Sequence, residues 1–170
     1  MHRKLLAIAC ALCCTTLSTL SAQDIQPSKW VKGDVAPAFT AEDTLGVSHS
    51  LADWKGQWVV VDFWASWCGD CRREFPDIKA LQAEFGERIT FVGLSMDHDA
   101  EAWRKCLSQQ QFPWLQISNL QRWKENTIAQ AYDLHWIPSY FVVDAEGLVL
   151  GSYTNATDLR SALEGLFAGE

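Results

Sequence analysis

Two cysteines three residues apart, Cys68 and Cys71, stand at a predicted junction between a strand and a helix. Residues 57–64 are almost continuously apolar, as in a strand buried on both faces, and residues 68–85 have helical spacing. The junction brings both sulfurs into the first helical turn, close enough to form a disulfide, and places Cys68 against unpaired N–H groups that stabilise a thiolate. Because the thiolate is the attacking species in disulfide exchange, the position predicts a reactive pair, with Cys68 as nucleophile and Cys71 as resolving thiol.

A zinc knuckle and a structural disulfide are the alternative interpretations of this spacing. A structural zinc site normally needs four ligands, and beyond the apolar N-terminal stretch that holds Cys10 and Cys13 the sequence has no second Cys-x-x-Cys; it also has no closely spaced pair of histidines. A disulfide that closes so short a loop constrains the unfolded chain little. We therefore expect no metal and no cofactor other than the Cys68–Cys71 disulfide itself.

The first 22 residues have the three parts of a secretory signal peptide. Basic residues precede an apolar stretch over residues 5–20, and the small residues Ser21 and Ala22 follow it. We expect residues 1–22 to be removed after Ala22, which predicts an extracytoplasmic, periplasmic location. The alternative is a lipoprotein anchored through Cys10, since the residues before this cysteine loosely resemble a lipobox.

After signal cleavage, the chain is long enough for one domain. We expect a loosely ordered lead-in at residues 23–35 and a single domain at residues 36–170, acting as a monomer. The chain has 21 acidic and 14 basic residues and a net charge of −7, which argues against nucleic acid as a partner. The one cysteine outside the pair, Cys106, lies on the apolar face of a predicted helix and is predicted to be buried and inert.

Strand and helix patterns alternate along this domain and predict an α/β fold. Short alternating segments around Gly46 predict an N-terminal hairpin, and Pro76 predicts a kink in the helix after the cysteines. Together the elements imply a mixed central sheet covered by helices on both faces. The expected strands are residues 37–41, 46–51, 57–64, 88–95, 114–117, 139–143 and 148–153, and the expected helices are residues 68–85, 99–110, 123–132 and 157–167.

Several segments resemble a known family. Residues 59–71, which read Val-Val-Val-Asp-Phe-Trp-Ala-Ser-Trp-Cys-Gly-Asp-Cys, resemble the active-site block of the thioredoxin superfamily, and Ile137-Pro138-Ser139 resembles its cis-proline loop. Residues 33–40 and 51–56 narrow the resemblance to the extracytoplasmic TlpA/ResA-like thiol–disulfide oxidoreductases. The resemblance implies a thioredoxin-like fold with an N-terminal hairpin and an inserted unit within about residues 97–121.

Two further residues are predicted to serve the cysteine pair. Asp62 interrupts the apolar strand, so burial should raise its pKa and let it accept the proton of Cys71, a role that the resemblance also assigns. The alternative is a strand-end aspartate that reaches solvent. Pro138 is expected to follow a cis bond, which holds the Ile137 backbone extended and available to a partner's backbone; an ordinary trans loop proline is the alternative.

The immediate neighbours of the pair are Trp67, Gly69 and Asp70. Asp70 departs from the resemblance, because this position often holds Pro or His in the family. A carboxylate there opposes formation of the Cys68 thiolate and favours a reducing pair, whereas the loss of a rigid Pro can act in the other direction.

The cis-proline loop adds two side chains with open roles. Trp136 stands where the family often has a small residue, and is either a partner-binding surface or a core aromatic. His135 is either a group that titrates near the site or an ordinary loop histidine.

The predicted function is an exported oxidoreductase that reduces protein disulfides, with protein disulfides or dithiols as substrates and an upstream thiol donor. The sequence does not choose among an apocytochrome, as in cytochrome c biogenesis, another thioredoxin-like protein and a general substrate. A peroxiredoxin-like peroxidase is one alternative, but Val61 and Ala65 occupy the places of the Pro and the Thr or Ser in its motif. The other is a copper-handling module, which needs a Met or His near the cysteines; Met96 is one of only two methionines.

Overall fold

The computed structural model describes residues 29–168. The predicted signal peptide, with Cys10, and the first part of the predicted lead-in lie outside these residues. No helix within residues 29–168 combines the length and the apolar character that crossing a membrane requires.

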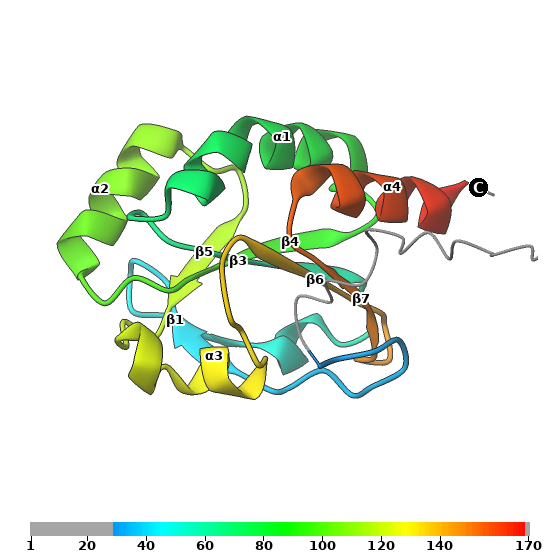
Figure 1. Ribbon diagram of the computed structural model, residues 1–170, viewed down its shortest axis with the longest axis horizontal. Coiled ribbons are helices and arrows are strands. Elements are labelled where there is room, and N and C mark those ends of the chain that lie inside the picture. The colour runs from blue at the N-terminus through cyan, green and yellow to red at the C-terminus, as the bar shows by residue number, and fades with distance from the viewer. Residues whose placement is uncertain (1–28, 169–170) are drawn as a thin grey trace, which may run out of the picture.

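Seven strands form one mixed sheet in the order β2-β1-β5-β4-β3-β6-β7 (Figure 1). The central strand β3 pairs in parallel with β4 and antiparallel with β6, which confirms the mixed sheet expected from the sequence. The strands are β1 Thr40–Glu42, β2 Ser48–Ser50, β3 Val59–Trp64, β4 Thr90–Ser95, β5 Leu115–Ser118, β6 Ser139–Val143 and β7 Val149–Tyr153.

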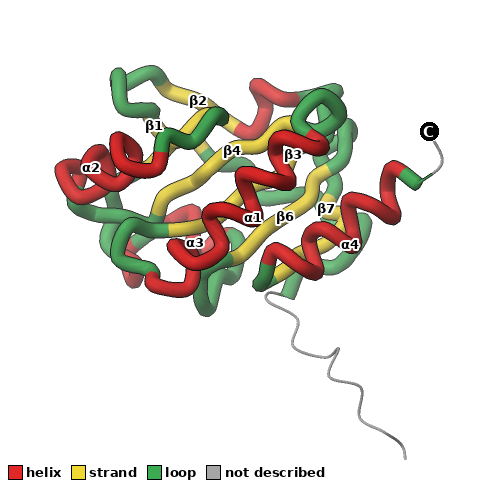
Figure 2. The backbone as a smooth tube through the Cα atoms, turned by 90° about the horizontal axis from the view of Figure 1, so that it is seen from above, coloured by secondary structure: helices red, strands yellow, loops and turns green. Residues whose placement is uncertain are grey.

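Helices lie on both sides of this sheet, as predicted. In Figure 1, α1, α2 and α4 lie above the sheet and the short α3 lies below it, and Figure 2 shows α1 and α4 crossing the same face. The helix α2 and the strand β5 fall within the predicted inserted unit. The bounds are α1 Gly69–Phe85, α2 Ala100–Gln110, α3 Thr127–Ala131 and α4 Ala156–Phe167, with 3-10 turns η1 Leu51–Trp54 and η2 Trp123–Glu125.

Alternation along β3 sends the side chains of successive residues to opposite faces of the sheet, and Val60 and Val61 belong to different apolar clusters. Val60 packs with residues of α1 and α4, whereas Val61 and Phe63 pack in the cluster that includes α3. Every residue of β3 is buried, Asp62 included. Because Asp62 is two residues from Val60, its carboxylate is on the face that α1 covers.

The predicted helix over residues 123–132 is wrong in one respect: it is broken at Asn126. The side-chain oxygen of Asn126 accepts hydrogen bonds from the N–H groups of Ile128 and Ala129, which caps a new helix there. The same side chain exchanges hydrogen bonds with Asn119 across the loop. These contacts divide the segment into η2 and α3.

The predicted lead-in is not loose at its end. Gly33 donates to the carbonyl of Val149 at 2.8 Å, Val149 donates to Asp34 at 2.8 Å, and Val35 forms a bridge with Leu148. Residues 33–35 are therefore attached to the β6–β7 hairpin.

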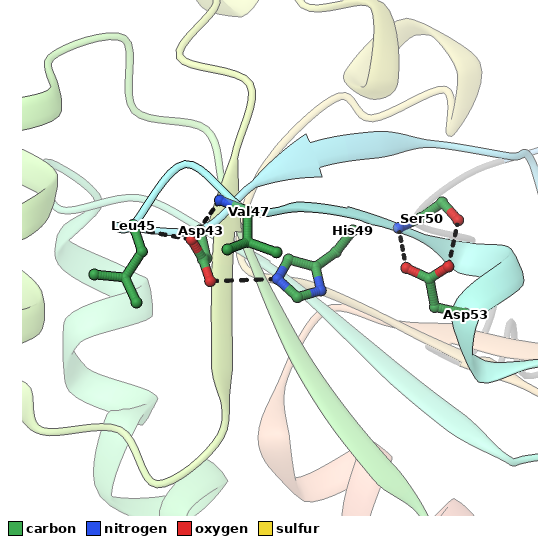
Figure 3. A network of polar contacts seen from close by, with 6 residues as sticks. All are labelled: Asp43, Leu45, Val47, His49, Ser50 and Asp53. Atoms are coloured by element: carbon green, nitrogen blue, oxygen red, sulfur yellow. Dashed lines mark hydrogen bonds and ion pairs between the residues drawn. The ribbon is translucent and has the colours of Figure 1, made fainter.

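The predicted N-terminal hairpin is formed by β1 and β2, and a single carboxylate organises its turn (Figure 3). Asp43 accepts hydrogen bonds from the N–H groups of Leu45 and Val47 at 2.8 and 2.9 Å, and its other oxygen lies 3.3 Å from His49 Nε2. These hydrogen bonds lower the pKa of Asp43. Gly46, with φ of +78°, supplies the left-handed residue of the turn.

Candidate active site at the start of α1

Cys68 and Cys71 form a disulfide at the N-terminus of α1. Cys68 is the capping residue of the helix, and its Sγ accepts a hydrogen bond from the N–H of Cys71 at 3.0 Å. A helix N-terminus has unpaired N–H groups and the positive end of the helix dipole, and both stabilise an anionic sulfur. The predicted environment for a Cys68 thiolate is therefore present.

Both sulfurs of the disulfide belong to buried residues. The exposed fraction of Cys68 is 6%, against 1% for Cys71, so its sulfur is the outer of the two but not a prominent one. The Cys68 Sγ lies 3.6 Å from the carbonyl oxygen of Ile137, which covers it from the loop before β6. The peptide bond between Ile137 and Pro138 is cis, as predicted, and the Ser139 hydroxyl donates to the carbonyl of Trp136 at 3.0 Å across this loop.

Asp62 is buried, with 3% of its surface exposed, so the solvent-exposed alternative is excluded. Burial raises the pKa of Asp62 to about 8, and the nearby charge of Glu74 adds to the rise. An acid with a pKa near 8 is close to the ordinary pKa of a thiol, about 8.5, so proton exchange with a cysteine is nearly balanced.

Glu74 is a functional candidate that the sequence interpretation missed. Its carboxylate accepts hydrogen bonds from the Tyr140 hydroxyl at 2.8 Å and from the N–H of Ala156 at 2.9 Å, and burial raises its pKa. Tyr140 is the register partner of Asp62 between β3 and β6, and burial raises its pKa well above the ordinary value. The sequence did contain an indication of this role. Glu74 lies three residues after Cys71 on the predicted helix, so the helical period places both residues on the same face, toward the sheet.

Asp97 is a second residue that the sequence interpretation did not single out. It is 1% exposed and follows β4, whose end lies beside the end of β3 in the parallel pairing. Its carboxylate accepts hydrogen bonds from the N–H and the hydroxyl of Ser66, at 2.9 and 2.7 Å, and from the hydroxyl of Ser95 at 2.7 Å. Asp97 therefore holds the loop that leads into Cys68.

Aromatic side chains surround the outer face of the disulfide. Trp67 is 56% exposed and Trp136 is 37% exposed, so Trp136 is not a core aromatic. Trp123, which begins η2, packs edge to face against Trp67 with ring centroids 6.4 Å apart. His135 is exposed, and its ring lies 6.1 Å from that of Trp136.

Asp70, the unusual residue between the cysteines, is exposed and forms an ion pair with Arg73 one turn later on α1. This partner was not anticipated, and it offsets part of the negative charge that Asp70 places beside Cys68. Gly69, the first residue of α1, is also exposed.

The Pro and the Thr or Ser of a peroxidatic motif are absent from this site, whereas one possible copper ligand, His135, lines the same surface pocket as Cys68. Val61 and Ala65, at the positions of a peroxidatic motif, are fully buried apolar residues, and Met96 is 1% exposed. Within residues 29–168, no three His, Cys, Asp or Glu side chains are grouped so as to hold a metal ion. Cys106 is buried and unpaired with another cysteine, as predicted, and burial raises its pKa.

Comparison with known proteins agrees with this geometry. Residues 32–151 match the model of the AhpC/TSA family. The thiol-disulfide oxidoreductase ResA of Bacillus subtilis is 29% identical over 149 residues, which are 86% of this chain and 78% of that protein. The thioredoxin-like protein YneN of the same organism is 38% identical over 64 residues, 38% of either chain.

A solved structure extends the similarity across the whole fold. The thioredoxin domain of a thiol-disulfide oxidoreductase from Bacteroides vulgatus is 33% identical, with a TM-score of 0.73, and the match covers 80% of this chain and 97% of that domain. The thioredoxin-like fold expected from the sequence is confirmed.

Proposed function

The chain belongs to the AhpC/TSA family and is a thiol–disulfide oxidoreductase of the thioredoxin type, and from this premise we propose that it is exported and reduces disulfides of partner proteins. The observation that carries the proposal is the Cys68–Cys71 disulfide at the N-terminus of α1, with the Ile137 carbonyl beside its outer sulfur.

The reaction begins with the reduced pair. The Cys68 thiolate attacks one sulfur of the substrate disulfide, which forms a mixed disulfide and releases the other substrate sulfur as a thiolate that takes a proton from water. Cys71 passes its proton to the ionised form of Asp62 and attacks the Cys68 sulfur. This step restores the Cys68–Cys71 disulfide and releases the second substrate sulfur as a thiolate. The thiolate is protonated and Asp62 gives up the proton it took, so two electrons pass from the enzyme to the substrate. An upstream thiol donor then reduces the pair again.

The reducing direction and the extracytoplasmic location are supported by separate features. The charge of Asp70 disfavours the Cys68 thiolate and thereby the reduced form, although the ion pair with Arg73 weakens this effect. The location is supported by the signal-like residues 1–22.

Reduction of insulin by dithiothreitol tests the central proposal. The domain without residues 1–22 should accelerate it, Cys68→Ser should abolish the acceleration, and Cys106→Ser should leave it intact. Cys71→Ser should accumulate a mixed disulfide with the substrate, which mass spectrometry identifies. An equal loss of activity in the Cys68 and Cys106 variants would overturn the assignment. Consumption of peroxide at a comparable rate would favour the peroxidase instead.

A further inference from the structure

A groove of about 450 Å³ opens beside the disulfide on the side of the cis-proline loop. Its lining residues are Trp67, Cys68, Gly69 and Asp70 at the start of α1, Trp123 of η2, and His135, Trp136 and Ile137 of the loop before β6. The walls come from three separate segments of the chain: the loop before α1, the turn η2 and the loop before β6. A groove that contains the reactive sulfur, three tryptophan side chains and the polar groups of Asp70 and His135 is a recognition surface for the reaction, since anything that fills it is already beside the Cys68 Sγ.

The tryptophans are held in position rather than scattered. Trp67 packs edge to face on Trp123, which is half-buried and packs against the core. Trp136 continues the aromatic wall, with His135 tilted against it. Such rings offer a large apolar contact area at low cost in side-chain entropy, as in other protein-binding surfaces.

The charges around the groove restrict what enters it. Among the residues that the structure describes, no lysine or arginine lines it, and its ionisable lining side chains, apart from Cys68, are those of Asp70 and His135. An adjoining groove shares Trp136 and Ile137 and is lined by the further carboxylates of Glu74 and Asp77, with Arg73 already paired to Asp70. A substrate with carboxylates near its cysteine meets like charge on both sides.

We propose that the groove binds the side chain next to the substrate's cysteine, and selects extended segments in which that side chain is aromatic or large and aliphatic and no acidic residue is adjacent. The inference rests on the proposed reduction of protein disulfides and specifies its substrate class. The Ile137 carbonyl, 3.6 Å from the Cys68 Sγ, sets where the substrate backbone passes, and the tryptophans receive the neighbouring side chain.

Five peptide disulfides test the selection. Each is a disulfide-linked dimer of one blocked pentapeptide with a central cysteine. In the reference peptide, both residues next to the cysteine are alanine. In the other peptides, one of these two alanines is replaced by phenylalanine or by glutamate, either before or after the cysteine. The reduced protein converts each dimer into two peptide thiols and becomes oxidised at Cys68–Cys71, so no other reductant is needed. Rate constants are read by chromatography after acid quenching.

The better phenylalanine order should react at least about tenfold faster than the alanine peptide, a factor of ten being the effect of a single well-buried apolar contact. The glutamate peptides, and glutathione disulfide with its several carboxylates, should react more slowly than the alanine peptide. In Trp123→Ala and in Trp136→Ala the ratio of phenylalanine to alanine rates should fall toward one. Trp123→Phe should keep most of the preference for the phenylalanine peptide. Leu45→Ala is the control, because Leu45 is 86% exposed on the hairpin turn between β1 and β2, and this variant should keep the whole preference.

Equal rates for the phenylalanine and alanine peptides in the unmodified protein would overturn the proposed groove while leaving the oxidoreductase in place. A ratio that survives in both tryptophan→alanine variants would also overturn it. Failure to reduce any peptide, together with failure to reduce insulin, would instead overturn the proposed function.

Discussion

The carboxylate of Asp97 holds Ser66 by two hydrogen bonds, one from its backbone N–H at 2.9 Å and one from its hydroxyl at 2.7 Å. Ser66 precedes Trp67 and Cys68, so this pair connects the end of β4 to the loop that carries the nucleophile. Because Asp97 is buried, these hydrogen bonds are not exchanged for water without cost.

Asp97→Asn should therefore both destabilise the protein and slow its reaction with disulfides. The asparagine amide keeps one acceptor oxygen, but its NH2 group replaces the other and faces groups of Ser66 and Ser95 that donate hydrogen bonds. At least one of these hydrogen bonds is lost, which should lower the free energy of unfolding by about 1–3 kcal/mol. Urea unfolding and the rate of Cys68 with a small disulfide measure the two effects. Ser161→Ala, which removes an exposed hydroxyl on α4, is the control and should change neither. Normal kinetics in Asp97→Asn would show that the contact does not position the loop.

Replacement of Asp62 by Asn should stabilise the protein, and more so at higher pH. The folded protein retains a proton on Asp62 up to about pH 8, whereas the unfolded chain releases it near 3.8, so the free energy of unfolding of the natural protein falls between these values. The fall amounts to about 6 kcal/mol if Asp62 alone is counted. Asp62→Asn lacks this term, so its gain in urea unfolding should be small at about pH 4 and largest at about pH 8. A gain independent of pH would contradict the assigned titration.

The same substitution should slow resolution of the mixed disulfide. In the natural protein the rate of attack by Cys71 should rise with pH as Asp62 ionises around pH 8. Loss of a positioned base should cost on the order of 10²-fold near neutral pH. Single-turnover reduction of a small disulfide, followed by acid quenching from about pH 6 to 9, measures the release step. An unchanged rate in Asp62→Asn would rule out its role as proton acceptor.

Glu74→Gln should lower the pKa of Asp62, because the charge of Glu74 adds to the rise that burial causes. The amide oxygen can still accept from Tyr140 and from the N–H of Ala156, so the packing is retained. Carbon-13 NMR of the Asp62 carboxyl group follows this titration directly. The shift should be smaller than the effect of burial, the larger cause, and a rise in the Asp62 pKa would contradict the coupling.

Asp70→Asn should make the Cys68–Cys71 couple more oxidising, since removal of the charge favours the reduced thiolate. The natural couple should lie near the thioredoxin value of about −270 mV, and the change should be about 10–40 mV. Arg73→Gln should act in the opposite direction, because it leaves the Asp70 charge without its partner. Equilibration with glutathione measures all three potentials. A more reducing Asp70→Asn variant, or a natural protein near about −120 mV, would overturn the reducing role.

The parts of the site that the sequence predicted are those with local causes. Three features can be recognised from residues that are neighbours in the sequence: the spacing of the cysteines, the acidic Asp62 in an apolar strand and the Ile137–Pro138 dipeptide. Glu74 and Ala156 are 82 residues apart in sequence, and Ser66 and Asp97 are 31 apart, so these contacts depend on how the elements pack. The break at Asn126 is different, because its cause is local: the side chain of Asn126 caps the N–H groups of Ile128 and Ala129, an N-cap that the sequence interpretation missed.

The two edge strands of the sheet determine whether a partner chain can add a strand to it. One edge is β2, only three residues long, and the other is β7, which pairs with β6 through an irregular register at Val142 and Val143 and continues into the bridge between Val35 and Leu148. Short and interrupted edges resist the strand-to-strand association that leads to aggregation. Within residues 29–168, neither edge therefore offers a long open strand for backbone hydrogen bonds with a partner chain, which favours the proposed passage of the substrate backbone beside Ile137 instead.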